Sequence, residues 1–165
     1  MAGGKARRFG SDKAHVRYNG WRLIDLVSDR LAVQCDALVV CGRTEPDFEC
    51  LPDLPEAGLG PLGGLNAALQ YANDNRFSHV LSAGVDAPNL PANLAETLSG
   101  EGAAIVRSQP VVGLWPVALA DDLAAFIADG GRALYRFADH VSARQIAFDP
   151  PLLNVNRPED LPSKA

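Results

Sequence analysis

Two patterns of apolar positions alternate along the chain and predict an α/β fold. Apolar residues spaced three and four positions apart predict helices, and such segments cover residues 21–34, 65–73, 91–99, 117–128 and 132–140. Short apolar runs lie between them and are typical of strands that helices cover; they cover residues 37–41, 79–85, 103–107, 111–115 and 143–148. The alternation predicts one three-layer α/β/α domain over residues 1–165, with a mainly parallel sheet.

Composition narrows the function classes. The 165 residues are 47% hydrophobic and 21% charged, which suits a globular domain with a continuous core. A net charge of −5 argues against a general nucleic-acid binder. No apolar run approaches the ~20 residues of a membrane span, and no hydrophobic segment follows the basic N-terminus, so we expect a cytoplasmic location and no membrane partner. Three cysteines without C-x-x-C spacing argue against a disulfide framework or a zinc clip.

The strongest chemical signal lies in the first thirteen residues. Gly3 and Gly4 are adjacent and let backbone N–H groups approach a ligand closely. They are followed by four cations that stand out in an acidic chain: Lys5, Arg7, Arg8 and Lys13. Backbone amides together with arginine and lysine predict a cradle for a polyphosphate. The spacing matches neither the P-loop nor the dinucleotide fingerprint. The alternative is a basic N-terminal tail.

Two acidic residues are candidate ligand contacts. Asp86 follows the apolar run 79–85, and ligands of open α/β sheets bind beyond the carboxyl ends of strands. A lone carboxylate facing a triphosphate suits Mg²⁺, which takes its other ligands from phosphate and water; the alternative is a turn cap. Asp53 lies in the irregular stretch 42–60, ahead of glycines at 60, 63 and 64. Glycines there would let the backbone read the edge of a base; the alternative is an ordinary loop before a helix.

Five short blocks, in order along the chain, resemble the molybdenum cofactor guanylyltransferases. The blocks are the glycine loop from Ala2 to Lys13, Gly60-Pro61-Leu62-Gly63-Gly64-Leu65, Asp86-Ala87-Pro88 with Leu90-Pro91, Pro110 to Trp115, and Asn154 to Leu161. Each block alone is a weak signal, but the series spans nearly the whole chain and is specific.

The resemblance implies a Rossmann-like fold and transfer of GMP from GTP to molybdopterin, with release of pyrophosphate. It implies Mg²⁺ at Asp86 and phosphate binding by Lys13, with Arg8 adding charge; these three are the expected catalytic residues. The remaining nucleotide contacts that it implies are Ala2, Gly3, Gly4, Asp53, Gly60, Pro61 and Gly64. Asn154 and Asn156 are expected on the molybdopterin side. The resemblance also implies molybdoenzymes, or the chaperones that insert their cofactor, as partners.

Three departures from the pattern keep alternatives open. The family has an apolar strand before the glycine loop, and this chain begins at Met1 without one, so we expect the sheet to lack its first strand. Phe9 stands where methionine is usual, and Val40 stands where some relatives place a polar base contact. The alternatives are a CTP-dependent molybdopterin cytidylyltransferase, whose loop resembles L-A-A-G, a sugar-phosphate nucleotidyltransferase, and a non-catalytic nucleotide-binding relic.

Overall fold

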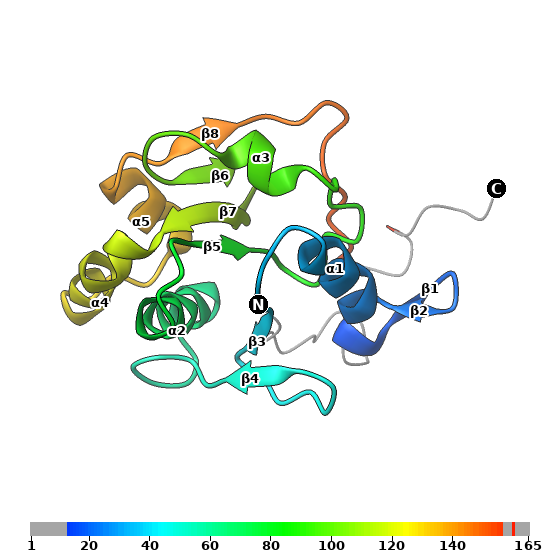
Figure 1. The fold of residues 1–165 in the computed structure, drawn as a ribbon, viewed down its shortest axis with the longest axis horizontal. Coiled ribbons are helices and arrows are strands. Elements are labelled where there is room, and N and C mark those ends of the chain that lie inside the picture. Colours follow the sequence, from blue (N-terminus) through cyan, green and yellow to red (C-terminus); the bar gives the residue numbers. More distant parts are fainter. Residues whose placement is uncertain (1–12, 157–159, 161–165) are drawn as a thin grey trace.

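The computed structural model describes residues 13–156 and residue 160 (Figure 1). The glycine-loop predictions for Ala2, Gly3, Gly4 and Arg8 therefore lie outside the described residues. The expectation that a first strand is absent concerns the same end of the chain and also stays a prediction.

Helices and strands alternate along most of the chain, which confirms the α/β class. The helices are α1 (Leu23–Ala32), α2 (Pro61–Asp74), α3 (Leu94–Leu98), α4 (Ala120–Ala128) and α5 (Leu134–His140), with 3₁₀ turns η1 (Lys13–His15) and η2 (Val117–Leu119). The strands are β1 (Arg17–Tyr18), β2 (Trp21–Arg22), β3 (Val39–Cys41), β4 (Glu49–Leu51), β5 (His79–Ser82), β6 (Ala104–Val106), β7 (Gln109–Pro116) and β8 (Arg144–Ile146).

The main sheet is mixed, in the order β5-β7-β6-β8. β7 runs antiparallel to both of its neighbours, whereas β6 and β8 pair in parallel. Three of the four strands thus share one direction, and β7 opposes them. The reason lies in the connection: only residues 107 and 108 separate β6 from β7, and so short a link can join only antiparallel strands. β3 and β4 pair in parallel as a separate two-stranded sheet.

Helices cover both faces of the main sheet, as the three-layer prediction requires (Figure 1). On one face, α2, α4 and α5 pack against Ile105 and Trp115. On the other face, α1 and α3 pack against Val106 and Val112. Successive side chains of a strand point to opposite faces, so the apolar runs of β6 and β7 serve both layers. A fully buried leucine or valine in such a layer contributes about 1.5–3 kcal/mol.

The sequence patterns did not predict two features in the N-terminal half of the chain, the β1–β2 hairpin and strand β4. The segment predicted to begin a helix at Trp21 first forms a hairpin, in which β1 and β2 are joined by Asn19 and Gly20 at positive φ of 50° and 88°. Asn-Gly is a strong signal for this two-residue turn. The stretch predicted as irregular contains β4, whose three residues are too short to show a periodicity. Among the described residues, no helix is long and apolar enough to cross a bilayer.

One buried polar contact ties β5 to β7 and can be tested. Trp115 Nε1 donates to Ser82 Oγ at 2.9 Å, and this hydroxyl donates to the carbonyl of Val111 at 2.7 Å. We predict that Ser82→Ala lowers the free energy of unfolding by about 1–3 kcal/mol, because the indole N–H loses its buried partner. Urea denaturation measures the change. Adding Trp115→Phe should give a less than additive loss, and strict additivity would contradict the contact.

Candidate functional site

Asp86 lies beyond the carboxyl end of β5, on a turn that spans residues 84–87. β5 ends at Ser82, and the Ala87 N–H donates to the carbonyl of Gly84 at 3.3 Å. The Asp86 carboxylate folds back over Gly84, so that a Cβ at position 84 would collide with Asp86 Oδ1. Asp86 is partly exposed in this position, as a ligand group beyond a strand end must be.

The C-terminal tail lies directly on the Asp86 turn. The Val155 N–H donates to the Asp86 carbonyl at 2.9 Å, and the Leu153 N–H donates to Asn89 Oδ1 at 2.8 Å. Val155 is fully buried, whereas Asn154 and Asn156 on either side of it are exposed. The alternation turns both asparagines outward, and Asn156 Nδ2 donates to Asn154 Oδ1 at 2.9 Å. The structure thus brings the two predicted asparagines to the carboxyl end of β5.

A buried glutamine that sequence reasoning missed fastens this tail. Gln109 is 5% exposed, and its Nε2 donates to the carbonyls of Leu152 and Leu153 at 3.0 and 2.8 Å. A polar side chain at the start of the otherwise apolar strand β7 was the available signal, because a buried amide needs hydrogen-bond partners.

Asp53 lies against the glycine-rich start of α2. The Leu54 N–H donates to the carbonyl of Gly63 at 3.2 Å, and a Cβ at position 63 would lie 3.0 Å from the Asp53 Cβ. Gly60, at φ 60°, precedes the helix, and Pro61 opens it, where proline is well tolerated. Burial raises the pKa of Asp53, although a hydrogen bond from the Gly58 backbone opposes this shift. Gly64, the remaining predicted glycine, is buried in the first turn of α2.

A small apolar cluster joins these elements to the segment that carries Lys13. Ala14, next to Lys13 in η1, is fully buried against Ile24 of α1 and Val40 of β3. Val85, the residue before Asp86, packs on the same cluster. The backbone of Lys13 therefore lies near β3 and near the turn that follows β5. Val40 itself is a core residue, which explains why no polar side chain occupies this position.

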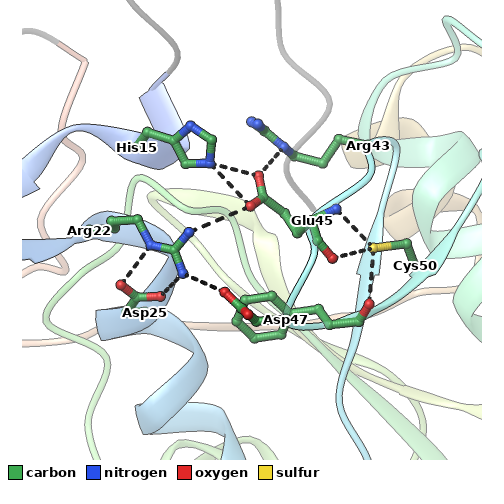
Figure 2. Close-up of polar contacts among 8 residues, drawn as sticks. His15, Arg22, Asp25, Arg43, Glu45, Asp47 and Cys50 are labelled. Carbon is green, nitrogen blue, oxygen red and sulfur yellow. Dashed lines mark hydrogen bonds and ion pairs between the residues drawn. The ribbon is translucent and has the colours of Figure 1, made fainter.

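The described residues contain a buried carboxylate that the sequence did not reveal. Glu45, in the loop between β3 and β4, is 2% exposed. Its carboxylate lies 2.7 Å from Arg43 Nε, 3.1 Å from His15 Nε2 and 3.8 Å from Arg22 Nη1, as Figure 2 shows. Burying a carboxylate is tolerable only where such partners surround it. His15 is a half-exposed partner of this group.

The Glu45 cluster is fixed on both sides. Arg22 Nε and Nη2 donate to the two oxygens of Asp25 at 2.8 and 2.7 Å, and Nη2 reaches Asp47 at 3.3 Å (Figure 2). The hydrogen bond between Arg22 and Asp25 lowers the pKa of Asp25 and raises the pKa of Arg22. The backbone of Glu45 is held by Cys50. The Glu45 N–H donates to Cys50 Sγ at 3.1 Å, and the Cys50 thiol lies 3.4 Å from the Glu45 carbonyl oxygen. The cluster thus joins η1, the start of α1 and the β3–β4 loop.

The site has two parts. One consists of the Asp86 turn and the tail with Asn154 and Asn156; the other consists of Asp53 and the start of α2. The cluster of Ala14, Val40 and Val85 lies beside the first part. Among residues 13–156 and 160, no group of three or more histidine, cysteine or acidic residues could hold a metal by itself. Any cation at Asp86 would therefore take further ligands from a substrate and water.

An acidic residue and exposed amides beyond a strand end of an α/β sheet, near a helix that begins after a glycine, are typical of nucleotide-binding α/β proteins. The sequence comparison specifies the family. The chain belongs to the family described as MobA-like NTP transferase domain, whose model matches residues 1–145.

Named relatives align over nearly the full chain. A molybdenum cofactor guanylyltransferase from Cereibacter sphaeroides is 38% identical over 98% of this chain and 91% of its own length. One from Rhizobium johnstonii is 35% identical, over 98% of this chain and 87% of its own length. Among solved structures, molybdopterin-guanine dinucleotide biosynthesis protein A from Archaeoglobus fulgidus has a TM-score of 0.77 at 24% identity. The alignment covers 97% of this chain and 92% of that one.

We predict that Glu45→Ala destabilises the protein. The substitution removes the contacts of the Glu45 carboxylate with Arg43 and His15. A hydrogen bond to a charged group contributes about 1.5–3 kcal/mol to stability. The free energy of unfolding, measured in urea, should fall by this amount. Asp47→Ala is the matched control, because its side chain is 72% exposed and its loss should change stability by less than about 0.5 kcal/mol. Equal effects of the two substitutions would contradict the cluster.

We predict that Asp53→Asn raises the melting temperature at pH 7. Because burial raises the pKa of Asp53 in the folded state, folding is disfavoured where this carboxyl is ionised, above its folded pKa. The penalty shrinks as the pH falls toward the ordinary value of 3.8. The gain from Asp53→Asn should therefore be larger at pH 7 than at pH 4.5 in thermal melts. Asp139→Asn, on an exposed residue of α5, is the control, and a gain independent of pH would contradict this account.

Proposed function

We propose that this chain transfers the GMP moiety of GTP to molybdopterin and releases pyrophosphate. The supporting geometry is the Asp86 turn with the 152–156 tail fixed on it by the hydrogen bond from Val155. It places a carboxylate suited to the triphosphate beside two exposed asparagines suited to a second substrate. The choice of substrates follows the names of the relatives that are 38% and 35% identical.

The two ends of the nucleotide are assigned to the two parts of the site. The triphosphate would contact the glycine loop, with Ala2, Gly3 and Gly4 supplying backbone N–H groups and Arg8 and Lys13 supplying charge. The base and sugar would lie against Asp53 and the start of α2, at Gly60, Pro61 and Gly64. Gly63 packs closely against the side chains of Leu59 and Asp53, which keeps Asp53 next to the start of α2.

Asp86 is the residue that suits a divalent cation, and we assign Mg²⁺ to it. The donor set fits, because one carboxylate held by the Gly84 turn leaves the other positions to phosphate oxygens and water. When bound, Mg²⁺ neutralises charge on the phosphates. Arg8 and Lys13 would offset the charge that develops on the α-phosphate and on the departing pyrophosphate.

The reaction needs no covalent intermediate with the protein. A phosphate oxygen of molybdopterin attacks the α-phosphorus of GTP, and the bond from this phosphorus to the β-phosphate bridging oxygen breaks in line. The products are the guanine dinucleotide form of molybdopterin and pyrophosphate. Phosphoryl-type transfer of this kind depends mostly on positioning and electrostatics. Asn154 and Asn156 would hold the pterin side, since their exposed amides can both donate and accept. We assign the reaction to the cytoplasm, with molybdoenzymes or their insertion chaperones receiving the product.

We predict that Asp86→Ala lowers kcat/KM for GTP by about 10²–10³-fold, the loss typical of removing one preorganised electrostatic group. The assay follows the transfer of radiolabelled GMP to molybdopterin. Asp139→Ala, on the exposed face of α5, is the matched control and should keep wild-type turnover.

Two results would overturn parts of the proposal. Unchanged turnover of Asp86→Ala, with folding confirmed by circular dichroism, would remove Asp86 from the site. Preference for CTP over GTP in the same assay would make the chain a cytidylyltransferase, and binding of no nucleotide would favour the relic alternative.

A further inference from the structure

The tail that carries Asn154 and Asn156 has no regular secondary structure. β8 ends at Ile146, and residues 147–156 form neither a helix nor a strand. A segment outside the helices and the sheet keeps its place through individual hydrogen bonds and buried side chains. The arrangement of the two exposed asparagines therefore depends on what holds residues 152–155.

Two buried side chains and two N–H groups hold part of this segment. Leu152 and Val155 are buried. The Leu153 N–H is bound by Asn89, and the Val155 N–H is bound by the carbonyl of Asp86. These contacts use the donors of the tail and leave its carbonyl groups to a different partner.

Gln109 is the residue that holds the carbonyl groups. From the start of β7, its Nε2 donates to the carbonyls of Leu152 and Leu153 at 3.0 and 2.8 Å. Each peptide group is planar, so one amide that binds two successive carbonyls fixes the orientation of two successive planes. The direction in which the chain continues to Asn154 is thereby set.

Gln109 is a costly residue to bury for stability alone. Its side chain is 5% exposed, and among the described residues no group donates a hydrogen bond to its buried Oε1. A buried acceptor without a partner costs free energy, and an apolar side chain of similar length would avoid that cost. The tail, rather than the packing of the core, therefore explains an amide at this position.

We propose that Gln109 is a positioning residue for the second substrate. By binding the carbonyls of Leu152 and Leu153, it keeps Asn154 and Asn156 in the arrangement that binds molybdopterin. Groups that support a binding surface from behind in this way preorganise it. Gln109 is buried and acts through the tail. The inference rests on the proposed function, in which the two asparagines contact the pterin side.

The nucleotide side of the site does not depend on this amide. The turn of residues 84–87 is closed by its own hydrogen bond, from the Ala87 N–H to the Gly84 carbonyl. Asp53 is placed by the contact of its neighbour Leu54 with Gly63. Loss of the Gln109 amide should therefore weaken the binding of molybdopterin and spare that of GTP.

The test replaces Gln109 and measures both KM values in the GMP-transfer assay. Gln109→Met removes both hydrogen bonds and keeps a side chain of similar length. A substrate binds only the fraction of chains whose site is in place, so the KM for molybdopterin should rise at least about threefold. The kcat and the KM for GTP should stay within about twofold, because saturating substrate restores the arrangement.

A second variant reverses the chemistry of the contact. Gln109→Glu places an oxygen opposite two carbonyl oxygens, so it repels the tail instead of only releasing it. The KM for molybdopterin should then rise at least about tenfold, since two donors are lost and an acceptor is added. If Gln109→Glu does not fold, Gln109→Met decides alone.

Gln34→Met is the matched control. The Gln34 amide also fastens main-chain segments, because its Nε2 donates to the carbonyl of Pro91 at 3.1 Å and its Oε1 accepts from the Ala95 N–H at 2.9 Å. Its hydrogen bonds do not reach residues 152–156. The control therefore loses similar contacts and should keep both KM values within about twofold.

Hydrogen exchange provides a readout that is independent of activity. In Gln109→Met, the amides of Leu153 and Val155 should exchange at least about tenfold faster than in the wild type, because the tail opens more often. Exchange in β6, at residues 104–106, should be unchanged, which also shows that the variant is folded.

Four outcomes would overturn the inference. They are an unchanged KM for molybdopterin, an equal rise of both KM values, the same rise in Gln34→Met, and unchanged exchange at Leu153 and Val155. A wild-type chain that transfers no GMP would contradict the proposed function and this inference with it. A wild type that transfers GMP, with Gln109 variants that match it, would contradict this inference alone.

Discussion

The arrangement around the site depends on one buried carboxylate. Glu45 holds Arg43, His15 and Arg22 around it, and these residues come from the β3–β4 loop, η1 and the start of α1. A buried charge is stable only while its partners stay in place. The carboxylate therefore constrains three segments at once, including the one that carries Lys13. The glycine loop precedes that segment in the chain, so Glu45 fixes the point from which the loop departs.

The sequence predicted the parts of the fold in which the same spacing of apolar residues recurs over many positions. α2 and α4 extend over several turns, so their apolar spacing located them to within a few residues. The position of Asp86 beyond a strand followed from an apolar run that ends in an acidic residue. The matching family model and the named relatives both agree with the resemblance seen in the sequence. Five motifs in the right order identify a family more reliably than any single motif does.

The rest depended on contacts between residues far apart in the sequence. β7 opposes its neighbours because a two-residue link follows β6, and strand periodicity carries no information on direction. The burial of Glu45 and Gln109 depends on residues that pack around them from distant parts of the sequence. The hydrogen bond from Val155 to the Asp86 carbonyl joins the C-terminal segment to a turn in the middle of the chain. A groove of about 430 Å³, lined by β3 and β5 among other elements, forms only in the folded chain. Short patterns cannot report such contacts.

The tight link between β6 and β7 also has a consequence for the order of folding. A hairpin closed by two residues forms within about 1–10 μs, because little loop entropy is lost. β7 is then ready to accept β5 on its other side. The tail reaches the Asp86 turn only after the whole intervening chain has folded, and contacts so distant in sequence form slowly. A ribosome must therefore release nearly all of these residues before the tail can pack on the Asp86 turn, whereas the sheet beneath it is assembled earlier.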